Sequence, residues 1–413
     1  MGEVGRAEPR LSTVEEQGLV PGATREGFWL LYVGSFIIYG DRFAIPPILL
    51  AISRDLQAPL GEVTAVASVY FLLYGLMQLP YGLLSDRVGR VRVLRVALLG
   101  MALANALSTV APTLGALVAG KALAAGLIAA ILPTSLVYLG DQVPFDHRQQ
   151  AIVNVLAAGA LGTAVATIGA GVLARYDAWR VVFAVPAALG LALSVFIGRL
   201  PEPIRRQRGA GPLTQLRRVM GRPWAVFVIA LSVAEGAVMV GFLTYLAPAL
   251  EAGGQSAAVA GLVVATYGVA VFGGMQVVKG VLRRRGISAA ALITIGGILL
   301  ILAYLAAAIE QGIVNILVAS MLVAFGYCFM HSTLQTWATE VAPQARGTAT
   351  SLFVTGVYTG AALGTAAVSG LADATRYQML FAVAAGATLP VLLVGALARS
   401  RYEVARTEKS IGA

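Results

Sequence analysis

Long apolar runs, separated by short polar connections, make up most of this sequence. A helix needs about 20 apolar residues in succession to cross the hydrocarbon core of a bilayer. Runs of this length recur between residues 28 and 398, so the pattern predicts an all-α membrane protein with twelve transmembrane helices. The expected spans lie near residues 28–51, 62–84, 93–112, 114–139, 150–174, 179–199, 223–250, 256–282, 288–309, 312–338, 350–372 and 378–398.

Composition excludes several other classes of protein. The chain is 58% hydrophobic and 12% charged, whereas a soluble domain carries about 25% charged residues. Its only cysteine, Cys328, and its two histidines, His147 and His331, are too few for a disulfide framework or a Cys/His metal site. The glycine-rich phosphate-binding loop of ATP-driven pumps is absent from the sequence. We therefore expect no enzyme activity, no cofactor and no metal ion.

Lys and Arg residues gather on one side of the expected topology. Most of the 30 lie in the two tails, in the central connection and in alternate short loops. Because basic residues mark the cytoplasmic side of a membrane, both termini are predicted to be cytoplasmic in a plasma (bacterial inner) membrane protein. The net charge of +10 is explained by this topology and predicts no nucleic-acid partner. The first 25 residues lack an apolar core, so we expect a soluble tail rather than a signal peptide.

The two halves of the chain repeat one another. Residues 75–87 read GLMQLPYGLLSDR and residues 273–285, which lie 198 positions later, read GGMQVVKGVLRRR. The same spacing aligns the Phe-Ala-Val segments at 183–185 and 381–383. Tandem six-helix halves place a binding site near the midplane between them. The expected domains are a tail (1–25), a six-helix bundle (26–200), a linker (201–222), a second bundle (223–399) and a tail (400–413).

Two short motifs carry a family resemblance. Residues 82–90 read GLLSDRVGR and residues 179–183 read WRVVF. The first resembles the signature loop of the major facilitator superfamily, and the second resembles the start of its sixth span. Over residues 25–400 the chain resembles that superfamily, and within it most resembles the twelve-span drug/metabolite:proton antiporters. The resemblance implies two pseudo-symmetric six-helix bundles that transport a solute by alternating access.

The signature loop is also predicted to act as a conformational latch. Its candidate residues are Gly82, Asp86, Arg87, Gly89 and Arg90. The two glycines allow close packing and a tight turn, and Asp86 can bridge to the N-terminus of a neighbouring helix, where anions are favoured. In the second half Arg284 replaces this aspartate, so the latch is expected to be one-sided. The alternative is that the basic residues only anchor a cytoplasmic loop.

Three ionisable residues lie inside the expected spans 1 and 4. Asp41 and Arg42 are roughly 15 Å from the outer end of span 1, and Lys121 is roughly 10 Å from the same side in span 4. Ionisable residues at such depth are candidates for function. Their matched depth predicts Asp41 or Arg42 within ion-pair reach of Lys121, facing a central cavity. In the superfamily that the chain resembles, this position of span 4 is usually an arginine linked to proton transfer. Lys121 departs from that pattern, and a buried lysine loses its charge more readily than an arginine does. Alternatively, Asp41 and Arg42 neutralise each other and only fix helix packing.

Polar residues in spans 7 and 10 are further candidates. Glu235 lies roughly 18 Å into span 7 and has no charged neighbour in the sequence. Burial without a partner disfavours an ionised carboxylate, which suits a proton site or a site for a cationic substrate. A protonated structural glutamate is the alternative. Tyr327, His331 and Gln335 form a polar stripe along span 10. Because histidine titrates near neutral pH, the stripe is a candidate cavity lining, with a packing role for His331 as the alternative.

Together these features favour a proton-coupled secondary transporter that exports a small amphiphilic drug or metabolite. The expected partners are a small-molecule substrate, protons and the lipid bilayer, and the protein is expected to be a monomer. A second hypothesis is a secondary importer of an organic anion or other small solute, in which Arg42 and Lys121 clamp the anion. A third is a non-transporting membrane sensor built on the same scaffold.

Overall fold

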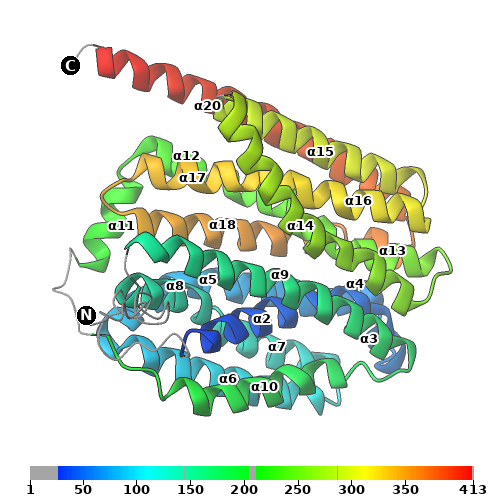
Figure 1. The fold of residues 1–413 in the computed structure, drawn as a ribbon. Helices are drawn as coiled ribbons and strands as arrows, with labels where there is room; N and C mark the ends of the chain where they lie inside the picture. Colours follow the sequence, from blue (N-terminus) through cyan, green and yellow to red (C-terminus); the bar gives the residue numbers. More distant parts are fainter. Residues whose placement is uncertain (1–26, 144, 204–210, 286, 412–413) are drawn as a thin grey trace, which may run out of the picture.

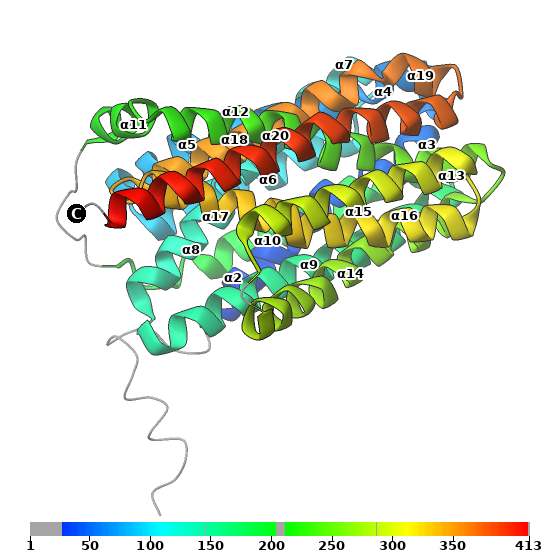
Figure 2. The ribbon, with the colours of Figure 1, turned by 90° about the horizontal axis from the view of Figure 1, so that it is seen from above.

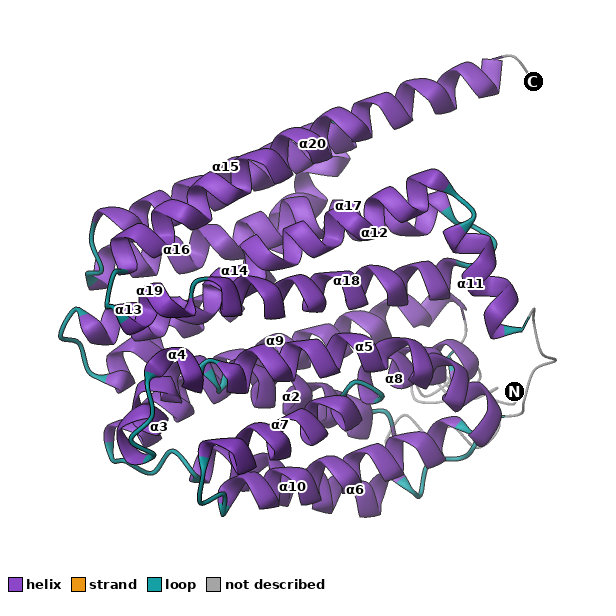
Figure 3. Ribbon diagram, turned by 180° about the vertical axis from the view of Figure 1, so that it is seen from behind, coloured by secondary structure: helices purple, strands orange, loops and turns teal. Residues whose placement is uncertain are grey.

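The structure, a computed structural model, describes residues 27–143, 145–203, 211–285 and 287–411. Within these ranges every regular element is a helix and no strand occurs (Figure 3). The predicted all-α fold is therefore confirmed. Among the residues in these ranges, the side chains at 82, 83, 86, 145, 146, 212, 282–285 and 406–411 lie outside the description.

Helices of the first half coincide with the apolar runs. A helix satisfies its own backbone polar groups, which is the requirement that lipid imposes on a spanning segment. The elements are α2 (Trp29–Phe43), η2 (Pro46–Ile48), α3 (Leu49–Asp55), α4 (Leu60–Val63), α5 (Ala65–Val88), α6 (Arg90–Thr109), α7 (Leu114–Ile128), α8 (Ile131–Gln142), α9 (Phe145–Arg175) and α10 (Val181–Ile197).

Helices of the second half follow the same order after the linker. Two of its short elements, η3 and η5, are single π-helical turns. The elements are α11 (Pro212–Met220), α12 (Pro223–Gly236), η3 (Ala237–Gly241), η4 (Phe242–Tyr245), α13 (Leu246–Ala252), α14 (Ala257–Arg285), α15 (Ala289–Ile309), α16 (Ile313–Gly326), η5 (Tyr327–His331), α17 (Ser332–Val341), α18 (Arg346–Ala367), α19 (Ser369–Asp373) and α20 (Tyr377–Ile411).

The number of membrane crossings can be compared with the predicted twelve. In the described part of the chain, nine helices are long and apolar enough to cross a membrane, and ten if α2 is joined across its 41° bend to Pro46–Asp55. The helix α10 is apolar but shorter, and the continuous helix α18, which contains several Thr and Gly residues, is not among the nine. Each of the twelve predicted segments contains a helix, so twelve spans fit the structure, while the number itself stays a prediction.

The helices form two groups that pack side by side. Helices α2–α10 occupy the lower part of Figure 1 and helices α12–α20 the upper part. Across the boundary α5 packs on α18 and α9 packs on α14. The helix α11 and the C-terminal end of α20 lie at one end of the bundle, here called the linker end; α4, α13 and α19 lie at the opposite, far end (Figures 1 and 2).

The two groups touch closely at the far end. A Cβ atom on Gly171 of α9 would lie 2.9 Å from the Cα of Gly261 on α14, so only glycines allow this approach. At the same end the backbone N–H of Gly61 donates to the carboxylate of Asp373. The two groups of helices are therefore in direct contact at the far end.

Interruptions of the helices recur at the 198-residue spacing of the sequence repeat. The helix α2 ends at Phe43, and the π turn η3 ends at Gly241, which is the matching position. Similarly, α7 ends at Ile128 and α16 ends at Gly326. Spans 1 and 4 of the first half are thus broken at the same places as spans 7 and 10 of the second.

The predicted linker and the predicted C-terminal tail both contain helix. Part of the predicted linker, Pro212–Met220, is the helix α11, and α20 continues through most of the predicted C-terminal tail to Ile411. Arg399 explains part of this extension, because it forms ion pairs with Glu340 at 2.8 Å and with Glu403 at 3.0 Å.

Candidate functional site

A buried ion pair joins α2 to α7 in the first half. Lys121 Nζ donates to Asp41 Oδ1 at 2.7 Å and to Asn105 Oδ1 at 2.9 Å. Lys121 is completely buried and Asp41 is 4% exposed. The predicted pairing of span 1 with span 4 is confirmed, whereas the prediction that the pair faces a central cavity is wrong, because both side chains are fully enclosed. The alternative, in which Asp41 neutralises Arg42, is wrong.

One oxygen of this carboxylate is left without a partner. Asp41 Oδ2 accepts no hydrogen bond from the described residues. The hydroxyl of Tyr70 interacts electrostatically with Asp41 but completes no hydrogen bond of normal geometry. The ammonium of Lys121 lies 5.2 Å from the ring centroid of Tyr70 and 4.8 Å from that of Phe183. A carboxylate accepts up to about four hydrogen bonds, so Asp41 has capacity for another donor.

Arg42 points toward the second half, although it follows Asp41 in the sequence. Successive helical residues are rotated by about 100°, so neighbouring side chains diverge. Arg42 Nη1 donates to the hydroxyl of Tyr358 on α18, and its guanidinium carbon lies 4.1 Å from the ring centroid of Tyr74. Its Nε and Nη2 groups have no hydrogen-bond partner among the described residues. Arg42, rather than Asp41, therefore reaches the interface between the two groups of helices.

A small cavity lies beside Arg42 at this interface. Its volume is about 20 Å³, and it is lined by residues of both groups, among them Thr163, Thr167, Thr244 and Tyr267. A cavity of about 10–15 Å³ is the minimum that holds one water molecule. The interface beside Arg42 is therefore nearly closed in this structure.

A second buried pair joins α12 to the π turn η5 in the second half. His331 Nδ1 lies 2.9 Å from Glu235 Oε1, and Glu235 is completely buried. The ring of Tyr327 stacks on the imidazole with centroids 4.6 Å apart and planes at 18°. The expectation that Glu235 lacks a partner is thus wrong. The stripe residue Gln335, one turn beyond His331, is partly exposed.

Both members of the second pair lie beside a π-helical turn. Glu235 precedes η3 by two residues, and His331 is the last residue of η5. Such turns are rare and occur frequently at functional sites, because they displace a side chain from its regular helical direction. The Oε2 atom of Glu235 accepts no hydrogen bond from the described residues, so this carboxylate can also take another donor.

The signature loop at the linker end has partners that the sequence did not suggest. Gly89 adopts φ +118°, a value that favours glycine. The backbone N–H groups of Arg90 and Val91, at the start of α6, donate to the Glu202 carboxylate. The side chain of Arg90 also donates to Asp141 at 3.3 Å. Glu202 thus occupies the helix N-terminus, where anions are favoured.

The rest of the predicted latch is only partly described. The side chains at Gly82, Asp86 and Arg284 lie outside the described residues. Arg87 is exposed at the end of α5. The bridge from Asp86 to a neighbouring helix therefore stays a prediction.

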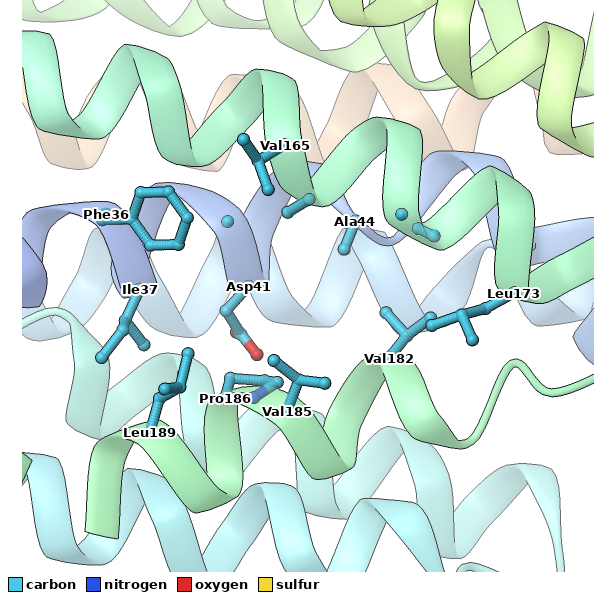
Figure 4. Close-up of a pocket in the computed structure, with 14 residues that line it drawn as sticks. Phe36, Ile37, Asp41, Ala44, Val165, Leu173, Val182, Val185, Pro186 and Leu189 are labelled. Atoms are coloured by element: carbon cyan, nitrogen blue, oxygen red, sulfur yellow. The ribbon is translucent and has the colours of Figure 1, made fainter. Parts of the chain in front are cut away.

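A larger cavity opens on the outer face of the first half. It measures about 180 Å³ and lies between α2, α9 and α10, with Asp41 among the residues that line it (Figure 4). Val165, Val185 and Leu189 line it and are between 41% and 49% exposed. Exposed apolar side chains of spanning helices face lipid, so this cavity approaches Asp41 from the side of the membrane.

Two hydrogen-bond partners of the candidate residues could not be identified from the sequence. Asn105 is a single amide within an apolar span, and Glu202 is a single carboxylate at the start of the linker, so neither belongs to a recognisable motif. A buried amide within an apolar span was the signal for Asn105, because such a group needs a partner. Among the described residues no cluster of three or more His, Cys, Asp or Glu side chains could hold a metal ion.

Comparisons with known proteins agree with this architecture. A family model described as Major Facilitator Superfamily matches residues 31–365 and 254–412. A triacylglyceride transporter of Mycolicibacterium hassiacum is 29% identical over 194 residues, which cover 45% of this chain and 36% of that protein. The multidrug efflux pump LfrA of Mycolicibacterium smegmatis is 28% identical over 179 residues, covering 43% of this chain and 34% of that protein. Each match therefore spans little more than a third of the curated relative.

Solved structures show the same fold. The crystal structure of the nucleoside transporter NupG superposes with a TM-score of 0.73 at 15% sequence identity. The superposition covers 91% of this chain and 99% of that one. At this low identity the likeness concerns the arrangement of the helices alone.

Proposed function

Because the chain belongs to the major facilitator superfamily, we propose that it is a proton-coupled secondary transporter that exports small amphiphilic compounds by alternating access. The observation that carries this proposal is the pair of buried carboxylate–base contacts. Asp41–Lys121 joins spans 1 and 4, and Glu235–His331 joins spans 7 and 10. Ionisable groups are costly inside a membrane and usually serve transport there.

The two contacts differ in the way they can handle a proton. Protonation of Asp41 would leave the Lys121 ammonium buried without its counter-charge, which is unfavourable. The protonated state should therefore be reached only when the surroundings of the pair change. In the Glu235–His331 contact a single shared proton leaves both groups satisfied, so this pair can exchange a proton without leaving an unpaired buried charge.

Export is supported by the relatives rather than by the geometry. One relative is named a multidrug efflux pump and another a triacylglyceride transporter. Both names fit amphiphilic compounds that partition into a membrane. The apolar cavity beside Asp41 supports the same class of substrate.

Alternating access would rock one group of helices against the other. The far-end contacts of Gly171 with Gly261 and of Gly61 with Asp373 would separate when the protein opens at that end. We propose that the signature loop, including Asp86, closes the linker end in that state.

The topology completes the proposal. We propose that the protein lies in a bacterial inner membrane with both termini cytoplasmic. The membrane-spanning parts would be the two bundles (26–200 and 223–399), and the tails and the linker (201–222) would lie on the cytoplasmic side. The exposed arginines at the linker end, Arg87, Arg92 and Arg218, support this orientation. We also propose that the protein works as a monomer.

Arg42 favours a second candidate, the transport of an organic anion. Arg42 is 3% exposed, and two of its nitrogen donors lack partners among the described residues. The charge of Lys121 is already neutralised by Asp41, so of the two cations predicted to clamp an anion only Arg42 lacks a carboxylate partner among the described residues. Transport of an anion that is lost in Arg42→Gln, with transport of neutral amphiphiles unchanged, would support this second function.

Transport in proteoliposomes with an imposed pH gradient tests the main proposal. A panel of fluorescent cationic, neutral and anionic amphiphiles should include at least one whose movement follows the gradient. Asp41→Asn should abolish that movement, whereas Glu310→Gln, an exposed carboxylate at the end of α15, serves as the matched control. Equal gradient-driven rates in Asp41→Asn, Glu235→Gln and the unaltered protein would refute proton coupling through these pairs.

A further inference from the structure

Two exposed arginines meet where α6 and α10 reach the linker end. The two helices pack against each other along the lower edge of Figure 1. Arg95 lies on α6, and Arg199 lies two residues beyond the end of α10 at Ile197. A Cβ atom on Gly198 would lie 3.3–3.4 Å from Cδ, Nε and Cζ of Arg95. The Arg95 guanidinium is therefore close to the backbone beside Arg199, although the two residues are far apart in the sequence.

Neither of these side chains has an acidic partner among the described residues. The ion pairs of the linker end involve Arg90 and Arg399 instead. The acidic residue nearest to Arg199 in the sequence is Glu202, whose carboxylate accepts from backbone N–H groups at the start of α6. Both Arg95 and Arg199 are exposed. Their positive charges are therefore open to an anion from outside the protein.

The two arginines border the surface that faces lipid. Val96 and Leu99 on α6 are 66% and 40% exposed, and Phe196 on α10 is 41% exposed. The guanidinium carbon of Arg199 lies 4.9 Å from the ring centroid of Phe196. Helical side chains lean toward the N-terminus of their helix, so Arg199 is directed back along α10 toward the apolar surface. The level at which apolar side chains give way to basic ones is the level of the lipid headgroups.

The second half lacks this arrangement. At the 198-residue spacing the two arginines correspond to Ile293 and Leu397, which carry no charge. The next basic residue there, Arg399, already has two carboxylate partners. Topology alone requires basic residues on the cytoplasmic side but does not require them to lack acidic partners. The difference between the halves therefore favours a ligand specific to α6 and α10.

We propose that the linker ends of α6 and α10 bind an anionic phospholipid from the adjacent leaflet, and that Arg95 and Arg199 bind its phosphate. Guanidinium groups form strong charge-assisted hydrogen bonds with phosphate. The acyl chains then lie over exposed apolar residues such as Val96 and Leu99. A zwitterionic lipid binds less well, because its ammonium group adds positive charge beside two cations. The site lies on the outer surface, so its occupancy does not depend on the direction of transport or on proton coupling.

Native mass spectrometry of the detergent-solubilised protein tests the proposal. The probes are phosphatidylglycerol and phosphatidylcholine with the same acyl chains, each titrated against the protein. Phosphatidylglycerol should bind at least about tenfold more tightly. Arg95→Gln and Arg199→Gln should each weaken its binding about fivefold, the effect of one basic residue near an anionic headgroup. The double variant should lose more, and the two single variants keep the test valid if the double variant does not fold.

A matched control and a photolabel locate the site. Arg175 and Arg376 are exposed at the far end, so Arg175→Gln/Arg376→Gln removes the same charge from the opposite side. This control should bind phosphatidylglycerol like the unaltered protein. In lipid nanodiscs, phosphatidylglycerol with a diazirine near the start of an acyl chain should label α6 and α10 around Val96 and Phe196. Inorganic phosphate should not displace the lipid, because it lacks the acyl chains that contact the apolar surface.

Four results would overturn the proposal. Equal affinity for the two lipids would show that the headgroup charge is not recognised. Unchanged binding in both single variants, or an equal loss in the far-end control, would show that these two arginines hold no lipid. Labels spread evenly over all lipid-facing helices would exclude a defined site. Displacement of the lipid by millimolar inorganic phosphate would show that the arginines bind a free anion rather than a lipid.

Discussion

The two halves of the molecule share a backbone plan but carry different chemistry at equivalent helices. In each half a carboxylate on the first span contacts a base on the fourth, Asp41 with Lys121 and Glu235 with His331. The positions themselves do not match, because at the 198-residue spacing Met239 corresponds to Asp41 and Ala319 to Lys121. The repeat therefore preserves which helices meet, while each half has placed its polar pair independently.

The bases differ in a way that separates the expected roles of the pairs. Lysine is a strongly hydrated point charge, and here it is enclosed by Asp41, Asn105 and two aromatic rings. Histidine is neutral or charged near physiological pH and needs no counter-charge in its neutral form. The first pair should resist separation, whereas the second should respond to pH.

The largest effect is expected from Asp41→Asn. This change leaves the Lys121 ammonium buried with amide partners only, and removal of one member of a buried ion pair costs about 3–5 kcal/mol. Thermal unfolding of the detergent-solubilised protein should shift to clearly lower temperature, and gradient-driven transport should stop.

The double variant Asp41→Asn/Lys121→Met is the control for that experiment. Because no buried charge is left, its unfolding temperature should recover, while transport stays absent. Recovery of transport together with stability would show that the first pair is structural only.

A smaller loss of stability is expected from Glu235→Gln. The amide can still bond the neutral imidazole of His331, so the cost should be about 1 kcal/mol, the worth of one hydrogen bond. The transport rate of the unaltered protein should vary with pH if the pair exchanges protons during transport. In the variant this variation should flatten, with binding of a neutral substrate retained. An unchanged pH profile and rate would make Glu235 structural.

The two halves are also expected to differ at the linker end, where only the first half has the predicted latch residue Asp86. Asp86→Asn should leave membrane expression intact and slow transport, because the anion that bridges to a helix N-terminus is lost. Arg284→Ala, at the equivalent position of the second half, should have less effect on the rate. Transport assays on equal amounts of the two variants test this, and equal damage would show that the latch is not one-sided.

The smallest effect is expected from Tyr327→Phe. The ring that stacks on His331 is kept and only the hydroxyl is removed, so stability should change by less than about 0.5 kcal/mol. The pH profile of transport should be unchanged. A flattened profile would instead place the Tyr327 hydroxyl in the proton pathway.

Sequence alone was sufficient for the features that depend on length and depth. Apolar runs of spanning length predicted the helices, and the segment at 82–90 together with the internal repeat indicated the fold. The depths of Asp41 and Lys121 in their spans predicted the ion pair, because rise per residue converts position into depth. The tight turn at Gly89 was likewise expected from its residue type.

Only the tertiary structure decided which side chains face one another around the helix axes. Glu235 and His331 are 96 residues apart, and two π turns alter the directions of nearby side chains in a way that no residue pattern revealed. The divergence of Arg42 from Asp41, the contact of Glu202 with the start of α6 and the membrane-facing cavity were hidden for the same reason. Hydropathy and depth fix a residue's place along a span. Its partners depend on the rotation of each helix against its neighbours, and that rotation is set by packing of the whole bundle.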